Sequence, residues 1–174
     1  MIVAPLSQDR ISELEELMRL GAPYVTSRTS SDYWMYARLF SSTCLVALVD
    51  ETMAGAVVAF RSQDDPDEVY VQDVVTHPDH RGRGVARRLL SLLSERVAQR
   101  GVTRIYLTSE PDNEAAHHTW LSLGFVNVPG DWEERGVHVT ANFKGPGRDR
   151  AVYELGLTSI VAGHTTGTPG PAEH

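Results

Sequence analysis

The chain lacks several features that would assign it to common classes of protein. Its 174 residues contain one cysteine, Cys44, so an internal disulfide is excluded. Cys44 lies within an apolar run, and we interpret it as a core thiol rather than a nucleophile. No apolar run approaches the roughly 18 residues of a membrane helix. The N-terminal MIVAPLSQDR lacks the basic and apolar regions of a secretory signal, so we expect a cytoplasmic protein with no membrane partner.

An excess of basic residues is also lacking. The formal net charge is −7, which argues against nucleic acid as a partner because phosphate backbones need a basic face. It is compatible with a small cationic acceptor. A content of 41% hydrophobic residues suits one globular domain with a sizeable core. We expect this domain to span residues 1–157, followed by a Gly/Thr/Pro-rich tail at 158–174 that cannot build a core.

Hydrophobic periodicity and capping residues predict a mixed α/β fold. The expected order is β-α-α-β-β-β-α-β-α-β-β, a mixed sheet with helices on both faces. Between the last two strands lies a long segment, 129–150, of the kind that tends to be functional or mobile, with further strand content expected at 137–143. The expected helices are 7–21, 31–40 (capped by Ser31 or Asp32), 84–99 and 113–123, and the expected strands are 2–4, 44–49, 53–60, 69–76, 102–108, 125–128 and 151–157.

The stretch from Tyr70 to Leu90, YVQDVVTHPDHRGRGVARRLL, indicates a site for phosphate. It reads as a strand, a loop rich in Gly and Arg, and the first turns of an amphipathic helix. Such a loop leaves backbone N–H groups unpaired at the positive end of a helix dipole, where pyrophosphate binds. The glycines matter because a Cβ there would hold the phosphate away from the backbone.

Two motifs in the chain resemble those of the GNAT superfamily of acyl-CoA N-acyltransferases. Arg81-Gly82-Arg83-Gly84-Val85-Ala86 fits the signature (Gln/Arg)-x-x-Gly-x-(Gly/Ala), after an apolar strand and at the start of a helix. Downstream, the family's Asn-x-x-Ala-x(7)-Gly-Phe spacing is matched by Asn113, Ala116, Gly124 and Phe125. The order of elements agrees from about Ile2 to Leu157. The resemblance implies a predominantly antiparallel, twisted sheet that is splayed at the cofactor site.

The resemblance also implies acetyl-CoA as the donor. Its pyrophosphate would lie on the N–H groups of residues 81–86, with local positive charge from the neighbouring arginines, including Arg88. The pantetheine arm would pair with the strand edge at 74–76, and the backbone N–H near Val75 would polarise the thioester carbonyl. Asn113 would contact the arm, or would simply cap its helix. The expected cofactor-binding residues are Val74, Val75, Thr76, Arg81, Gly82, Arg83, Gly84, Val85, Ala86, Arg87, Asn113 and Trp120.

Amine acetylation needs a group that removes a proton, because an alkylamine is mostly protonated at neutral pH. Asp73 is the first candidate, since it sits mid-strand among apolar neighbours where a carboxylate needs a partner. The alternative is a structural hydrogen bond or ion pair. With the Val75 N–H, Asp73 forms the expected catalytic set. No metal site is expected, because His77 and His80 lack a third ligand. Weaker candidates for the base are Glu68, His77, His117 and His118.

Trp120 departs from the family pattern. Many members have a tyrosine four residues before the glycine of the Gly-Phe pair, where it is thought to protonate the departing thiolate. An indole N–H can donate a hydrogen bond but is not a useful acid. The CoA thiol has a pKa of about 8.5 by analogy with cysteine, so solvent could protonate it. We therefore assign no protein general acid.

The acceptor is expected to be a small amino-acid-like or amino-sugar amine. The segments SSDYWMYARLFSSTCLVAL, VYVQDVV and TSEPDNEAA resemble diaminobutyrate acetyltransferases and aminoglycoside 3-N-acetyltransferases. The expected acceptor-binding residues are Tyr33, Asp73 and Trp132, and the sequence allows a homodimer. Two alternatives stay open: acetylation of protein N-termini or lysines, and an acetyl-CoA-binding sensor without turnover, which Trp120 favours and Asp73 opposes.

Overall fold

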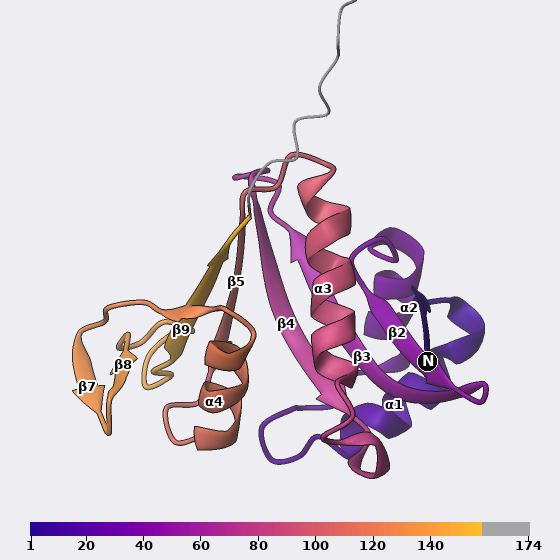
Figure 1. Ribbon diagram of the computed structural model, residues 1–174, viewed down its shortest axis with the longest axis horizontal. Helices are drawn as coiled ribbons and strands as arrows, with labels where there is room; N and C mark the ends of the chain where they lie inside the picture. Colours follow the sequence, from indigo (N-terminus) through magenta and orange to yellow (C-terminus); the bar gives the residue numbers. More distant parts are fainter. Residues whose placement is uncertain (158–174) are drawn as a thin grey trace, which may run out of the picture.

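A single sheet of seven strands organises the computed structural model, which describes residues 1–157 (Figure 1). The strand order is β1-β2-β3-β4-β5-β9-β6, and every neighbouring pair is antiparallel except β4 and β5. The expected tail lies outside the described residues. The strands are β1 (Ile2–Pro5), β2 (Leu45–Val49), β3 (Thr52–Arg61), β4 (Glu68–Thr76), β5 (Arg104–Ser109), β6 (Val126–Asn127) and β9 (Ala151–Gly156), with a separate hairpin of β7 (Trp132–Glu134) and β8 (Val137–Val139).

Helices cover both faces of the sheet, as expected. On one face, α3 buries Leu89 and Leu93 in a core shared with the apolar residues of β2 to β5 and β9. On the other, α1 and α2 form a second core around Leu14 and Tyr33, against β2 and β3. The helices are α1 (Ile11–Arg19), α2 (Ser30–Leu39), α3 (Val85–Ala98) and α4 (Glu114–Ser122), with short 3-10 turns η1 (Gln8–Arg10) and η2 (Pro78–His80). The mixed α/β fold predicted from periodicity is confirmed.

The differences from the expected elements lie at element ends and in the long segment. Thr29, not Ser31 or Asp32, caps α2, because Thr29 and Asp32 form a reciprocal capping box. Strand content at 137–143 is limited to β8, and its partner β7 was not anticipated. All three residues of β7 are exposed, so they lack the apolar alternation by which strands are recognised.

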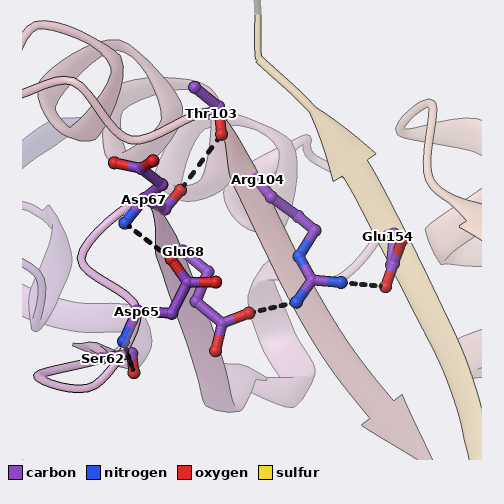
Figure 2. Close-up of polar contacts among 7 residues, drawn as sticks. All are labelled: Ser62, Asp65, Asp67, Glu68, Thr103, Arg104 and Glu154. Atoms are coloured by element: carbon purple, nitrogen blue, oxygen red, sulfur yellow. Dashed lines mark hydrogen bonds and ion pairs between the residues drawn. The ribbon is translucent and has the colours of Figure 1, made fainter.

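The sheet splays between β4 and β5. Their parallel register joins only residues 68–71 to residues 104–107, and beyond these the strands diverge (Figure 1). At the paired end, Arg104 on β5 bridges Glu68 on β4 and Glu154 on β9, with 2.6 Å between Arg104 Nη1 and Glu154 Oε1 (Figure 2). The bridge ties three strands together at the end where they still pair. The other end of β4 is left open for the functional site.

The start of α3 packs closely against the backbone of Gly55, on β3. A Cβ built on Gly55 would lie 2.5 Å from Val85 Cγ1 and 2.9 Å from Val75 O. We expect Gly55→Ala to lower the free energy of unfolding by about 1–3 kcal/mol, because the start of α3 must move. The measurement is urea denaturation, with Gly156→Ala as the matched control, since no atom lies within 4 Å of a Cβ built on Gly156. Equal stability of the two variants would contradict this account.

Candidate active site

The loop that leads into α3 leaves its backbone open to an anion. Gly82 and Gly84 have φ of +71° and +77°, and a Cβ built on either would meet no atom within 4 Å. The first hydrogen bond of the helix runs from Arg88 N to Gly84 O at 2.9 Å. The N–H groups of residues 85–87 therefore have no helical carbonyl to pair with, and the first turn holds no acidic side chain. This arrangement suits a phosphate group.

Arginines surround this loop. Arg81, Arg83, Arg87 and Arg88 are all exposed, so their charge is available beside the free N–H groups. Arg87 Nη2 also donates to Ser122 O at 3.1 Å, at the C-terminal end of α4. The helix that begins at the first motif thus contacts the helix that carries the second, across the splay.

In α4, the two side chains singled out by the family pattern both have partners within the protein. Asn113 Oδ1 accepts from Ala116 N at 3.0 Å, so Asn113 caps the helix. Trp120 Nε1 donates to the buried Ser109 Oγ at 2.7 Å, at the end of β5. The indole N–H is therefore engaged in holding α4 against β5. Contacts of Asn113 and Trp120 with the cofactor stay predictions.

The backbone of β4 faces the splay at alternate residues. His77 N donates to Ala54 O at 2.9 Å, and residues two apart on an antiparallel pair repeat this pattern. The register pairs Val75 with Ala56, so the Val75 N–H points toward β3. The N–H groups of Val74 and Thr76 then point the other way, into the splay. This corrects the expectation that the Val75 N–H is directed at a thioester.

Asp73 lies on the same face of β4 as Val75, toward α1 and α2, with 9% of its side chain exposed. Arg28 Nη2, from the loop between α1 and α2, lies 3.6 Å from Asp73 Oδ2. Burial raises the pKa of the Asp73 carboxyl above its ordinary 3.8, while the charges of Arg28 and Lys144 oppose the rise. Asp73 thus forms an ion pair, the alternative role expected for it, and its role as the base stays a prediction.

Tyr33 holds Arg28 in position. Its hydroxyl accepts from Arg28 N at 2.9 Å, and its ring is 1% exposed within the core under α1 and α2. Tyr33 therefore acts on Asp73 only indirectly, through Arg28. Sequence reasoning missed Arg28, although it is the one charged residue in the hydroxyl-rich loop 23–29.

Lys144 is the second residue that sequence reasoning missed. Its Nζ lies 2.5 Å from Tyr70 Oη and 5.2 Å from the centre of the Tyr70 ring, on β4. A signal was present, because Lys144 is the only lysine in the chain. By contrast, Trp132 lies on β7, beyond β9 as seen from β4, so the fold does not bring it to Asp73 (Figure 1).

The weaker candidates for a base are engaged elsewhere or exposed. Glu68 is bound by Arg104, and His117 Nδ1 lies 2.8 Å from Tyr153 Oη. His77 Nδ1 accepts from Asp79 N at 3.3 Å, and His118 is exposed. Cys44 is buried, which raises the pKa of its thiol to about 12 and leaves it inert.

The described residues also bear on metal and membrane binding. Within residues 1–157, no cluster of three or more His, Cys, Asp or Glu side chains is arranged to hold a metal ion. None of the helices in that range has both the length and the apolar character needed to cross a bilayer.

Comparison with known proteins identifies a family and several named relatives. The model described as the Acetyltransferase (GNAT) family matches residues 11–125. The L-2,4-diaminobutyric acid acetyltransferase of Nocardia farcinica is 33% identical over 115 residues, which cover 65% of this chain and 60% of that protein. Its counterpart from Streptomyces coelicolor is 31% identical over 154 residues, covering 86% and 85%.

The fold is shared with solved structures. The diaminobutyrate acetyltransferase of Paenibacillus lautus, in complex with L-2,4-diaminobutyric acid and coenzyme A, superposes with a TM-score of 0.74. The match covers 89% of this chain and 93% of that one at 21% identity, which shows a common fold.

Proposed function

Because this chain belongs to the GNAT acetyltransferase family, we propose that it transfers an acetyl group from acetyl-CoA to a primary amine of a small amino acid. The observation that carries the proposal is the position of Asp73. Its carboxylate is largely shielded from solvent, with 9% of the side chain exposed, and lies on β4, the strand that precedes the turn η2 and the Gly-Arg loop. The relatives named as L-2,4-diaminobutyric acid acetyltransferases make a diamino acid the favoured acceptor.

The residues of the splay fit acetyl-CoA. The loop at 81–87 offers free N–H groups, open space above Gly82 and Gly84, and arginine side chains for the phosphates. On β4, residues 72–76 pair with no other strand of residues 1–157 on the β5 side, which leaves room for an extended pantetheine arm. Bound acetyl-CoA would supply the electrophilic carbonyl carbon of its thioester.

Asp73 and Arg28, on the side of β4 toward α1 and α2, would carry out the proton transfer. Asp73 accepts a proton from the acceptor ammonium, which makes the nitrogen nucleophilic. Arg28 keeps the Asp73 carboxyl in place and favours its ionised form. The Val74 N–H, which points into the splay, is our candidate for polarising the thioester carbonyl, in place of Val75. No acid is assigned to the leaving thiolate, because Trp120 is bound to Ser109.

A panel of amines tests this proposal and its alternatives. We expect CoA thiol release to be fastest with L-2,4-diaminobutyrate, by about tenfold or more in kcat/KM over aminoglycosides, lysine peptides and peptide N-termini. A preference for peptides would favour a protein acetyltransferase. Binding of CoA without thiol release for any amine would favour a sensor. The homodimer and the cytoplasmic location remain predictions.

A further inference from the structure

We propose that Lys144 binds the carboxylate of the acceptor and thereby selects amino acids over simple amines. The inference rests on the proposed function and concerns the same site. It assigns the specificity of acetylation to a loop that lies 71 residues after Asp73 in the sequence.

The loop that carries Lys144 is built to hold one shape. Backbone hydrogen bonds join Thr140 and Arg150 in both directions, at 2.8 and 3.0 Å, and close its base. Inside the loop, Asn142 N donates to Asp149 Oδ1 at 2.8 Å, and Gly147 N donates to Asn142 Oδ1 at 2.7 Å. Arg150 also binds Glu110 at 2.9 Å, just after β5. Because these bonds fix the backbone, the direction in which Lys144 leaves the loop is set by the fold.

The partners of Lys144 leave its charge uncompensated. Its Nζ contacts the hydroxyl and the ring of Tyr70, which are neutral, and it forms no ion pair with any residue from 1 to 157. The Tyr70 ring in turn packs against Tyr106 on β5, with ring centres 5.0 Å apart. An ammonium has three donors, so the contact with Tyr70 Oη leaves others for a ligand. Arg28 differs, because its charge is already matched by Asp73.

The charges of Asp73 and Lys144 are complementary to those of an amino acid that carries a second amine. Asp73 would receive the ammonium group that is acetylated, and Lys144 would receive the carboxylate. Lys144 contacts Tyr70, which lies three residues before Asp73 on β4, so the two charged side chains meet the same short stretch of one strand. In keeping with this placement, the charge of Lys144 acts to lower the pKa of the Asp73 carboxyl. A simple diamine has no group for Lys144, and a polycationic aminoglycoside would be repelled by it.

The test removes the charge from the protein and the carboxylate from the acceptor, separately and together. The variant is Lys144→Met, and the acceptors are L-2,4-diaminobutyrate and 1,3-diaminopropane, which is the same diamine without the carboxylate. We expect Lys144→Met to raise KM for diaminobutyrate about 10- to 100-fold with little change in kcat. With diaminopropane, which has no carboxylate to lose and is itself a dication at neutral pH, the variant should have a kcat/KM equal to or above that of the wild type. Lys144→Arg, which keeps the charge, should retain most of the affinity.

Two controls separate the possible failures. An unchanged KM for acetyl-CoA and an unchanged melting temperature show that Lys144→Met keeps the fold. An equal loss with both acceptors, or no loss with either, would overturn the role of Lys144 while leaving the proposed function intact. If the wild type acetylated no amine, the proposed function would fail. Calorimetric titration of diaminobutyrate into the CoA-saturated proteins would then decide for or against Lys144, by whether the variant binds more weakly.

Discussion

Asp73→Asn is expected to lower kcat/KM for the amine acceptor by about 10²- to 10⁴-fold at neutral pH, with KM for acetyl-CoA unchanged. Asparagine has nearly the shape of aspartate but accepts no proton. The acceptor would then have to arrive as the neutral amine, which is a small fraction at pH 7 for an amine with a pKa of about 10. Steady-state thiol release at varied acceptor concentration measures the effect.

The pH dependence gives this prediction a second signature. In the wild type, the rate should fall as pH drops through the pKa of Asp73, because only the ionised carboxyl accepts a proton. Burial raises that pKa, so the fall should begin above the ordinary value of 3.8. In Asp73→Asn this limb disappears. The kcat/KM of the variant should instead rise about tenfold per pH unit toward the pKa of the amine, and the deficit should shrink accordingly.

Glu68→Gln is the matched control. Glu68 lies on the same strand, with 14% of its side chain exposed against 9% for Asp73, and it also pairs with an arginine. It belongs to the bridge at the paired end of β4 and β5, away from the splay (Figure 2). We expect Glu68→Gln to keep full activity. If Asp73→Asn also kept full activity, Asp73 would be a structural partner of Arg28 only.

The sequence predicts the Gly-Arg loop and α4 well as elements of structure, because each lies in a continuous stretch. Strand, Gly-Arg loop and helix follow one another between Tyr70 and Leu90, so local periodicity and glycine positions determine where they lie. The same holds for the Asn113 cap, whose bond to Ala116 spans three residues. Such short-range features are set by backbone geometry that the sequence states directly.

The residues of the proposed acceptor site could not be predicted in the same way, because they converge only in the fold. Arg28 and Lys144 lie 45 residues before and 71 residues after Asp73. Arg28 stands out as the one charged residue of its loop and Lys144 as the only lysine, but neither feature points to Asp73. The direction of the N–H groups on β4 depends on pairing with β3. That register shifts between Val58 and Ala59, which leaves Gln72 without an opposite residue. A sequence pattern of period two does not reveal such a bulge, so Val74 could not be distinguished from Val75.

Gly84→Ala is expected to weaken binding of CoA about 100-fold while costing the fold only about 1–2 kcal/mol. The cost to the fold comes from φ of +77°, which a residue with a Cβ adopts reluctantly. The loss of affinity has a different cause. The space above Gly84 is open, so the new methyl group would project to the position where a phosphate must approach the free N–H groups of the loop.

Gly101→Ala separates these two effects. Gly101 follows α3 at its other end, with φ of +84° and no atom within 4 Å of a Cβ built on it. The backbone strain of the two variants should therefore be alike, and urea denaturation should give similar losses of stability. Calorimetry with CoA should then show weak binding for Gly84→Ala and ordinary binding for Gly101→Ala. Equal affinities would mean that the pyrophosphate does not lie on this loop, and the assignment of the loop to the cofactor would have to be abandoned.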